Sequence, residues 1–355
     1  MDSGDDDPEI ERLLAALTAP RRSNEARAHH TISDFYLKRF ADDEHWLTLV
    51  DLHAPKPQGA RRKTNNVSVN NDFYTVIGSG GEESPAVERL LSHVEGAAAR
   101  AMKTVANAWF FPPPPRDRLD LSLWMAFQMV RTPEARRRHQ AIADVAAKVI
   151  FRGIDTPEKA RARLRAVDRQ EPTEKDVADL LRLTSNLGGY DIVPDPNEHI
   201  EVMLSTAEQL APLLAGMSWS VAKFKEPALL SSDHPLTYYV EPENRDPMRG
   251  VGLMTADEIR FPLDPSTVLL MSPGLVPQTV GSLAIEAARE INQLTVDFAF
   301  EFVFMHPDQD HLAGLDLGAH PRPLLEVDGA IDGTSTDGVN RAPERLRPAR
   351  RRRSK

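Results

Sequence analysis

The stretch Leu229–Val240, LLSSDHPLTYYV, predicts two short strands joined by a polar turn. Apolar and aromatic residues flank the polar group Ser231–Pro235 on both sides. Pro235 has no N–H to donate to a sheet ladder, so the chain must turn or lie at a sheet edge there. A buried charge is costly unless it is paired. Asp233, at the end of a strand that we expect to be buried, is therefore predicted to have a functional role.

Working outward from this stretch, further short segments are rich in β-branched or aromatic residues and are separated by Pro or Gly, as is typical of strands. Two lie near the start of the chain and the others follow the middle region. We expect strands at Trp46–Leu52, Val67–Ile77, Trp219–Phe224, Leu229–Ser232, Leu236–Val240, Ile259–Leu263, Val268–Met271 and Phe298–Met305. A turn is expected at residues 55–59, between the first two strands.

The middle of the chain carries apolar residues at helical spacing. Helices are predicted over Pro85–Trp109, Arg116–Arg131, Pro133–Arg152, Pro157–Val167, Glu174–Leu187 and Asn197–Ala215, and others over residues 29–40 and 282–297. Thr173 is expected to cap the helix over Glu174–Leu187, and Ser282 is expected to cap the last helix. Helices in the middle with strands at both ends indicate an α+β fold. Its mixed or antiparallel sheet would unite the N-terminal hairpin with the C-terminal strands.

Composition restricts the chemistry. None of the 355 residues is cysteine, so disulfides, thiolate nucleophiles and zinc–thiolate sites are excluded and a reducing compartment is expected. No apolar run approaches the ~18 residues of a membrane helix. The acidic start, Asp2–Glu11, is the opposite of a basic signal-peptide start. A cytoplasmic protein without a membrane segment is therefore predicted.

Charge is distributed unevenly. The segment Arg341–Lys355 holds eight basic residues and one acid, Glu344, so its net charge is +7. Because the net charge of the whole chain is −10, the rest of the chain carries −17. Such an acidic body repels nucleic acid unless a groove is locally basic. The tail is predicted to be disordered, and its arginines can contact nucleic-acid phosphates weakly and without sequence preference. These arginines are Arg350, Arg351, Arg352 and Arg353.

Three parts of the chain are predicted. Residues 1–27 form an acidic appendage with a short helix over Pro8–Leu17, ended by Pro20. Residues 28–306 form a single α+β domain. Residues 307–355 form a flexible tail that is basic at its end.

Several short stretches occur in a characteristic order. They are His30-x-x-x-x-Phe-Tyr-Leu-Lys-Arg-Phe40, Phe73-Tyr74-Thr75, the helix bearing Glu88 and Glu95, Arg131-Thr132-Pro133, Ser232-Asp233-His234-Pro235, Phe261-Pro262-Leu263-Asp264-Pro265, and Asn292. This ordered set resembles the bacterial domain-of-unknown-function 4238 family over about Ala28–His306. Family members usually have proline three residues after the second histidine, where this chain has Ser33. The resemblance implies a fold and a site, but no activity.

His30 and Asp233 are the first candidate pair. An imidazole that titrates near neutrality, with a carboxylate to hold its tautomer, is a general-base arrangement. The same two groups also suit a divalent metal, through nitrogen and oxygen. The structural alternative is that His30 caps a helix start while Asp233 binds backbone amides at a turn. The residues do not single out a cofactor.

Asn292 and Arg131 are the supporting candidates. Asn292 lies mid-helix among apolar neighbours, where asparagine has poor propensity, so it either hydrogen-bonds Asp233 or a ligand, or it lies on the surface. Arg131 precedes Pro133 at a helix break. Its guanidinium can clamp a carboxylate or phosphate, or it pairs with Glu88 or Glu95.

Two functions follow from these candidates. The first is a hydrolase directed at a phosphodiester or nucleic acid. In it, His30 and Asp233 would carry out the catalysis, and Asn292 and Arg131 would be the orienting groups. The second is a non-catalytic binding or effector module in which the same polar residues hold distant segments together. The signatures HExxH and GxSxG are absent from the sequence, so the common zinc-protease pattern and the nucleophile-elbow pattern of serine hydrolases are not present.

Overall fold

The computed structural model describes residues 28–318, except residues 72, 78–82, 169–170, 190, 247 and 249. The described residues divide into two compact units. The larger unit holds residues 28–135 and 196–318, and the smaller unit holds residues 136–195. Helices and mostly antiparallel sheets confirm the predicted α+β class. The appendage predicted at residues 1–27 and residues 319–355 of the predicted tail lie outside the described residues. In the described first part of that tail, Leu312, Leu315 and Leu317 pack against a core cluster.

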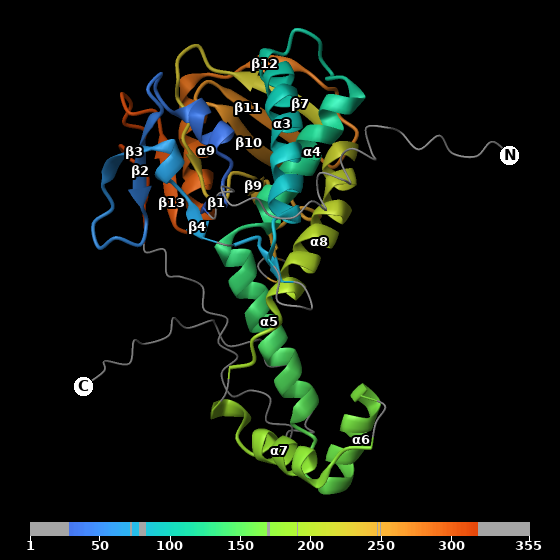
Figure 1. Cartoon of the computed structure of the whole chain (residues 1–355). Helices are drawn as coiled ribbons and strands as arrows, with labels where there is room; N and C mark the ends of the chain where they lie inside the picture. The colour runs from blue at the N-terminus through green and yellow to red at the C-terminus, as the bar shows by residue number, and fades with distance from the viewer. Residues whose placement is uncertain are drawn as a thin grey trace, which may run out of the picture. The chain divides into compact units, whose positions relative to one another are not determined.

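One sheet of the larger unit joins the start of the chain to its end (Figure 1). Its order is β3 (Gly59–Lys63), β2 (Trp46–Asp51), β13 (Phe302–Met305) and β8 (Ser231–Ser232), and every pairing is antiparallel. As predicted, the N-terminal strand β2 thus shares a sheet with C-terminal strands, but its hairpin partner is β3 and not the predicted strand Val67–Ile77.

Strand β3 is absent from the sequence prediction, which placed a turn at its first residue and no strand in its range. Its residues, GARRK, show no apolar alternation because the strand lies at a sheet edge and is mostly exposed. Charged residues at an edge also discourage pairing with another chain. Arg61 and Lys63 instead cover the Trp46 ring, at 5.3 and 4.8 Å from its centroid.

A second sheet is built from C-terminal strands alone. Its order is β12 (Val280–Ser282), β7 (Ser218–Lys223), β11 (Thr267–Ser272), β10 (Glu258–Asp264) and β9 (Thr237–Tyr239). Only β12 runs parallel to its neighbour. Strands β8 and β9 come from the single stretch Leu229–Val240 but belong to different sheets. The turn at Pro235 therefore passes the chain from one sheet to the other.

Long helices supply most of the remaining core of the larger unit. They are α3 (Ala86–Asn107), α4 (Pro115–Val130), α8 (Pro196–Gly216) and α9 (Ile285–Phe298), and α4 packs against both α3 and α8. The apolar stripe expected in the first of these helices is buried, apart from the partly exposed Leu90. Ser282 was expected to cap the helix before Phe298, but it lies in β12, and Ala284 occupies the cap position.

The segment that begins at Ala28 is less helical than predicted. β1 (Ala28–His30) pairs antiparallel with β4 (Val69–Asn71), and helix α2 (Asp34–Leu37) begins only after it. A 3₁₀ turn, Lys38–Phe40, follows α2. The expected strand Val67–Ile77 is likewise divided, into β4 and β5 (Val76–Ile77), and β5 pairs with β6 (Glu83–Ser84). The two histidines therefore lie on a short strand.

Tyr36 of α2 connects the two sheets. Its ring is fully buried beside Trp124, Phe261 and Phe304. Its hydroxyl lies 2.7 Å from the Pro262 carbonyl of β10 and 2.6 Å from Ser231 Oγ of β8. Because the single phenolic proton goes to the carbonyl, Ser231 must donate to the tyrosine oxygen.

The smaller unit is helical. It contains α5 from Arg136 onward (the helix spans Pro133–Phe151), α6 (Pro157–Asp168) and α7 (Glu174–Thr184). Its small core centres on three buried apolar residues, Ile154, Ala160 and Val177. As expected, Thr173 caps α7, and Asp176 completes a reciprocal capping box.

Within the described ranges, no helix has both the length and the apolar composition needed to cross a membrane.

Replacing Tyr36 by Phe removes the hydroxyl but keeps the ring. The Pro262 carbonyl and Ser231 then lose a buried partner. We expect the free energy of unfolding to fall by about 1–3 kcal/mol, measured by urea unfolding. Tyr239→Phe is the matched control, because its hydroxyl meets only Glu241 in an exposed contact. An equal loss in both variants would contradict the bridging role of Tyr36.

Candidate functional site

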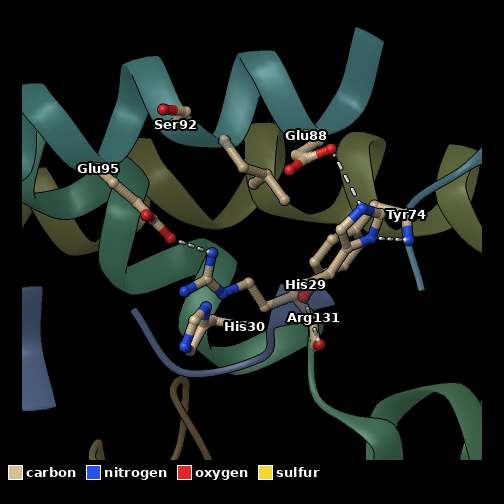
Figure 2. Close-up of a pocket in the computed structure, with 8 residues that line it drawn as sticks. His29, His30, Tyr74, Glu88, Ser92, Glu95 and Arg131 are labelled. Atoms are coloured by element: carbon tan, nitrogen blue, oxygen red, sulfur yellow. Dashed lines mark hydrogen bonds and ion pairs between the residues drawn. The ribbon is translucent and has the colours of Figure 1, made fainter. Parts of the chain in front are cut away.

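A pocket of about 160 Å³ opens in the larger unit beside α3 (Figure 2). β1 contributes two histidines, α3 contributes four side chains, Tyr74 precedes β5, and Arg131 directly follows α4. The lining residues are His29, His30, Tyr74, Glu88, Leu91, Ser92, Glu95 and Arg131.

Helical geometry explains the contribution of α3. Residues three or four apart lie on the same helix face, and Glu88, Ser92 and Glu95 are spaced by four and three. The side chains of Glu88 and Glu95 are about one-third exposed, 31% and 27%. This face of α3 therefore presents two carboxylates and a hydroxyl to the pocket.

His29 is held by two partners. The backbone N–H of Tyr74 donates to its Nδ1 at 3.0 Å, and Nε2 lies 3.2 Å from Glu88 Oε2. Since Nδ1 accepts, Nε2 carries the proton and donates to Glu88. The Tyr74 ring stacks on the imidazole at a centroid distance of 5.5 Å. His29 is thus a buried positioning residue that orients the Glu88 carboxylate.

His30 differs from its neighbour. Its ring lines the pocket and forms no hydrogen bond with any described residue, and Nε2 is fully enclosed. A buried polar atom without a partner requires an explanation, such as a catalytic role or a bound molecule. Among the eight lining side chains, His30 is the one with a buried polar atom that lacks a hydrogen-bond partner.

Arg131 forms a buried network, and only 1% of its side chain is exposed. Its Nη1 donates to Glu95 Oε1 at 2.7 Å, Nη2 donates to Ser33 Oγ at 2.6 Å, and Nε donates to the Thr31 carbonyl at 3.1 Å. The sequence left Glu88 and Glu95 as alternative partners of Arg131, and in the structure Arg131 pairs with Glu95. The predicted site residue Arg131 is therefore in the pocket, but it is bound to protein groups.

The network continues beyond the guanidinium. Ser33 Oγ donates to Glu95 Oε1 at 2.8 Å and accepts from Trp124 Nε1 at 2.8 Å. The Gln128 amide oxygen, oriented to satisfy its neighbours, lies 2.8 Å from Arg131 Nε and 2.7 Å from Nη2. Tyr74 donates its hydroxyl to the Arg131 carbonyl, and burial raises the pKa of this tyrosine. β1, α3 and α4 are thereby fixed around the pocket.

Asp233 occupies a different place. Its two carboxylate oxygens accept the backbone N–H groups of Phe300 and Glu301 at 2.8 and 2.7 Å. The carboxyl group is surrounded by protein, and this burial raises its pKa to about 7 although both N–H donors favour the charged form. It joins the end of β8 to the residues before β13. It does not line the α3 pocket, and no hydrogen bond connects it to His30 in the described residues.

Asn292 is also bound to backbone. Its Oδ1 accepts from the Leu230 N–H at 3.1 Å, and its Nδ2 donates to the Ala228 carbonyl at 2.8 Å. The residue is buried, only 4% exposed, so it is not the surface residue that one interpretation of the sequence placed there. Its contacts tie α9 to the segment before β8, and it lies outside the pocket lining.

Several lining residues were missed as candidates. His29 was treated only as a neighbour of His30, and Ser92 was not considered. Glu88 and Glu95 were named only as partners for Arg131. The usable signal was the four-and-three spacing of Glu88, Ser92 and Glu95 along one helix. The described residues hold no group of three or more His, Asp or Glu side chains suited to a metal ion.

Comparison with known proteins adds the family. Residues 28–309 match the family described as "Protein of unknown function (DUF4238)". The chain belongs to this family. The resemblance inferred from the ordered motifs is thus confirmed. No curated protein matches the chain, and no solved structure matches it.

Arg131→Lys tests whether the guanidinium holds the pocket wall. A lysine reaches fewer acceptors, so at least two of Thr31, Ser33, Glu95 and Gln128 lose a buried donor. At about 1–3 kcal/mol for each, we expect the free energy of unfolding to fall by about 2–6 kcal/mol in urea titration. Arg61→Lys, at a 58% exposed arginine, is the control. A stability loss no larger than that of the control would contradict the network.

Asp233→Asn tests the buried carboxyl. Because folding raises its pKa from 3.8 to about 7, the native state holds a proton that the unfolded state lacks between these values. Its contribution to stability is fully present below the unfolded pKa and is lost as pH rises through the folded pKa. The stability of wild type relative to the variant should therefore fall from about pH 4 to about pH 7.

Urea unfolding across this pH range measures the difference. Asp51→Asn serves as the control, because Asp51 is exposed and accepts from the His53 N–H. A difference that grows with pH would show that hydrogen bonding, rather than burial, sets the charge of Asp233.

Proposed function

We propose that the α3 pocket is the active centre of a hydrolytic enzyme. In this proposal Glu88 is the general base that activates water, and His30 exchanges a proton with the leaving group. Arg131 holds the wall through Glu95. The predicted reaction class is kept, whereas Glu88 replaces Asp233 as the acting carboxylate.

The observation that carries the proposal is the unpartnered ring of His30. An imidazole that titrates near neutrality suits proton transfer, and hydrogen bonds to protein would otherwise hold it in one state. Here the ring lines the pocket with no hydrogen-bond partner among the described residues. Its capacity to donate or accept is therefore left for a bound molecule.

Glu88 supports the proposal through its orientation. The imidazole of His29 donates to one carboxylate oxygen, and the Tyr74 N–H fixes the tautomer that makes this possible. A base acts efficiently only when it is positioned within hydrogen-bond reach of the proton it removes. The second oxygen of Glu88, Oε1, has no partner within the described chain.

The size of the pocket limits what it receives. A volume of about 160 Å³ corresponds to about five waters at roughly 30 Å³ each. It therefore admits a reacting group and an attacking water, while larger parts of a substrate remain outside.

The second candidate function is a non-catalytic binding or effector module. Asp233 and Asn292, two of the four residues singled out from sequence, bind backbone groups outside the pocket. Their contacts are those expected of residues that hold distant segments together. This function requires that His30 and Glu88 recognise a ligand without turning it over.

Two other proposals rest on sequence. The absence of cysteine supports a cytoplasmic site of action. Arg350, Arg351, Arg352 and Arg353 support weak contact with nucleic acid.

The enzyme proposal is tested with chromogenic substrates. Purified protein is assayed against p-nitrophenyl acetate, alanine p-nitroanilide and bis(p-nitrophenyl) phosphate. We expect turnover of at least one, and a loss of about 100-fold or more in kcat/KM for Glu88→Gln and for His30→Gln.

His93→Gln is the matched control, because His93 is an exposed histidine on α3 outside the pocket lining. Turnover that survives in both pocket variants, or none by wild type on any of the three substrates, would overturn the enzyme proposal in favour of the binding module.

A further inference from the structure

We infer that the α3 pocket accepts a positively charged nitrogen group, an ammonium or amidinium, as the part of the ligand that enters it. This inference concerns the same site as the proposed function and assigns its ligand class. It differs from the phosphodiester substrate considered from sequence, because a phosphodiester is an anion.

The balance of charge in the pocket is the first argument. Glu88 and Glu95 contribute two carboxylates to the pocket lining, and Arg131 contributes one guanidinium. The Arg131–Glu95 pair at 2.7 Å is neutral as a unit. The charge of Glu88 is therefore not compensated by an arginine or lysine among the lining residues. Opposite charge attracts most strongly where water is partly excluded.

The second argument is that Arg131 is not available to an anion. All three guanidinium nitrogens already donate, to the Thr31 carbonyl, Glu95 and Ser33, and Gln128 adds a further acceptor. Binding a phosphate or carboxylate would require breaking a buried pair, which is strongly unfavourable.

The third argument is the pair of free carboxylate oxygens. Glu88 uses Oε2 for His29, and Glu95 uses Oε1 for Arg131 and Ser33. The other oxygen of each has no partner in the described parts of the chain. An ammonium or amidinium has several N–H donors and no acceptor, so it complements this lining.

A ligand in the pocket is indicated independently by His30. Its enclosed Nε2 lacks a hydrogen-bond partner, and this observation does not depend on the two carboxylates. A neutral His30 also offers a ring nitrogen as an acceptor for a further N–H of the ligand.

The test uses three probes of nearly equal size that differ in charge: benzamidinium, benzamide and benzoate. Calorimetric titration of the full chain should give benzamidinium a Kd at least about 10-fold lower than either other probe, equivalent to about 1.4 kcal/mol. Equal affinities, or a preference for benzoate, would overturn the inference.

Substitutions at Ser92 place the binding in the pocket. Ser92 is exposed and four residues after Glu88, so a lysine there forms a favourable helix pair with Glu88 and puts a cation into the pocket without a folding cost. We expect Ser92→Lys to weaken benzamidinium at least about 10-fold, whereas Ser92→Gln, of similar length and uncharged, should change it by less than about 3-fold. Equal effects of both substitutions would overturn the inference.

Glu88→Gln should also weaken benzamidinium at least about 10-fold, because the amide keeps an acceptor for His29 but removes the charge. Glu290→Gln is the control, since Glu290 pairs with Arg260 away from the pocket. Thermal unfolding confirms that each variant is folded before titration. A folded Glu88→Gln protein that binds benzamidinium as well as wild type would contradict the inference.

The two proposals fail separately. If benzamidinium binds as predicted but no substrate is turned over, the hydrolase proposal fails and the ligand class stands. If His30 and Glu88 are needed for turnover but benzamidinium does not inhibit competitively, the ligand class fails and the hydrolase stands.

Discussion

A guanidinium with only 1% of its side chain exposed must have acceptors arranged around it, and this requirement organises the centre of the larger unit. Arg131 meets it with the Thr31 carbonyl, Ser33 Oγ and Glu95. These acceptors come from the chain after β1 and from α3, whereas Arg131 itself ends α4. If any of these segments moved away, a buried charge would lose a partner, so the network allows one arrangement.

In the same arrangement, some charged groups are bound to one another, and another remains available to a ligand. Glu95 and Arg131 compensate one another inside the wall. Glu88, two helical turns away on the same face of α3, is oriented by His29, and one of its oxygens remains available. His30 keeps its ring nitrogens without hydrogen bonds in the described chain. The residues we propose to meet a ligand are therefore those that the stabilising network does not use.

Elements with a strong local pattern were predictable. The apolar stripe of α3 and the α8 helix follow from helical periodicity. The sharing of one sheet by β2 and β13 was expected from the order of elements, with helices in the middle and strands at both ends. Strand β3 was missed, because its pairing with β2 rather than apolar alternation defines it. β1 was interpreted as part of a helix, since its hydrogen bonds go to β4, which is about forty residues away along the chain. Pairing of that kind leaves no local signal.

The sequence alone determined the α+β class and the family, because these depend on the order of elements and motifs along the chain. It also determined the helix face that carries Glu88, Ser92 and Glu95, because that face depends on spacing within one element. Only the tertiary structure decided which polar residues meet. It brought His29 and His30 to Glu88 and Arg131, and it used Asp233 and Asn292 to bind backbone groups beside β8. The physical reason is that a polar side chain bonds whichever buried group packing leaves unsatisfied nearby, and packing joins residues far apart in sequence.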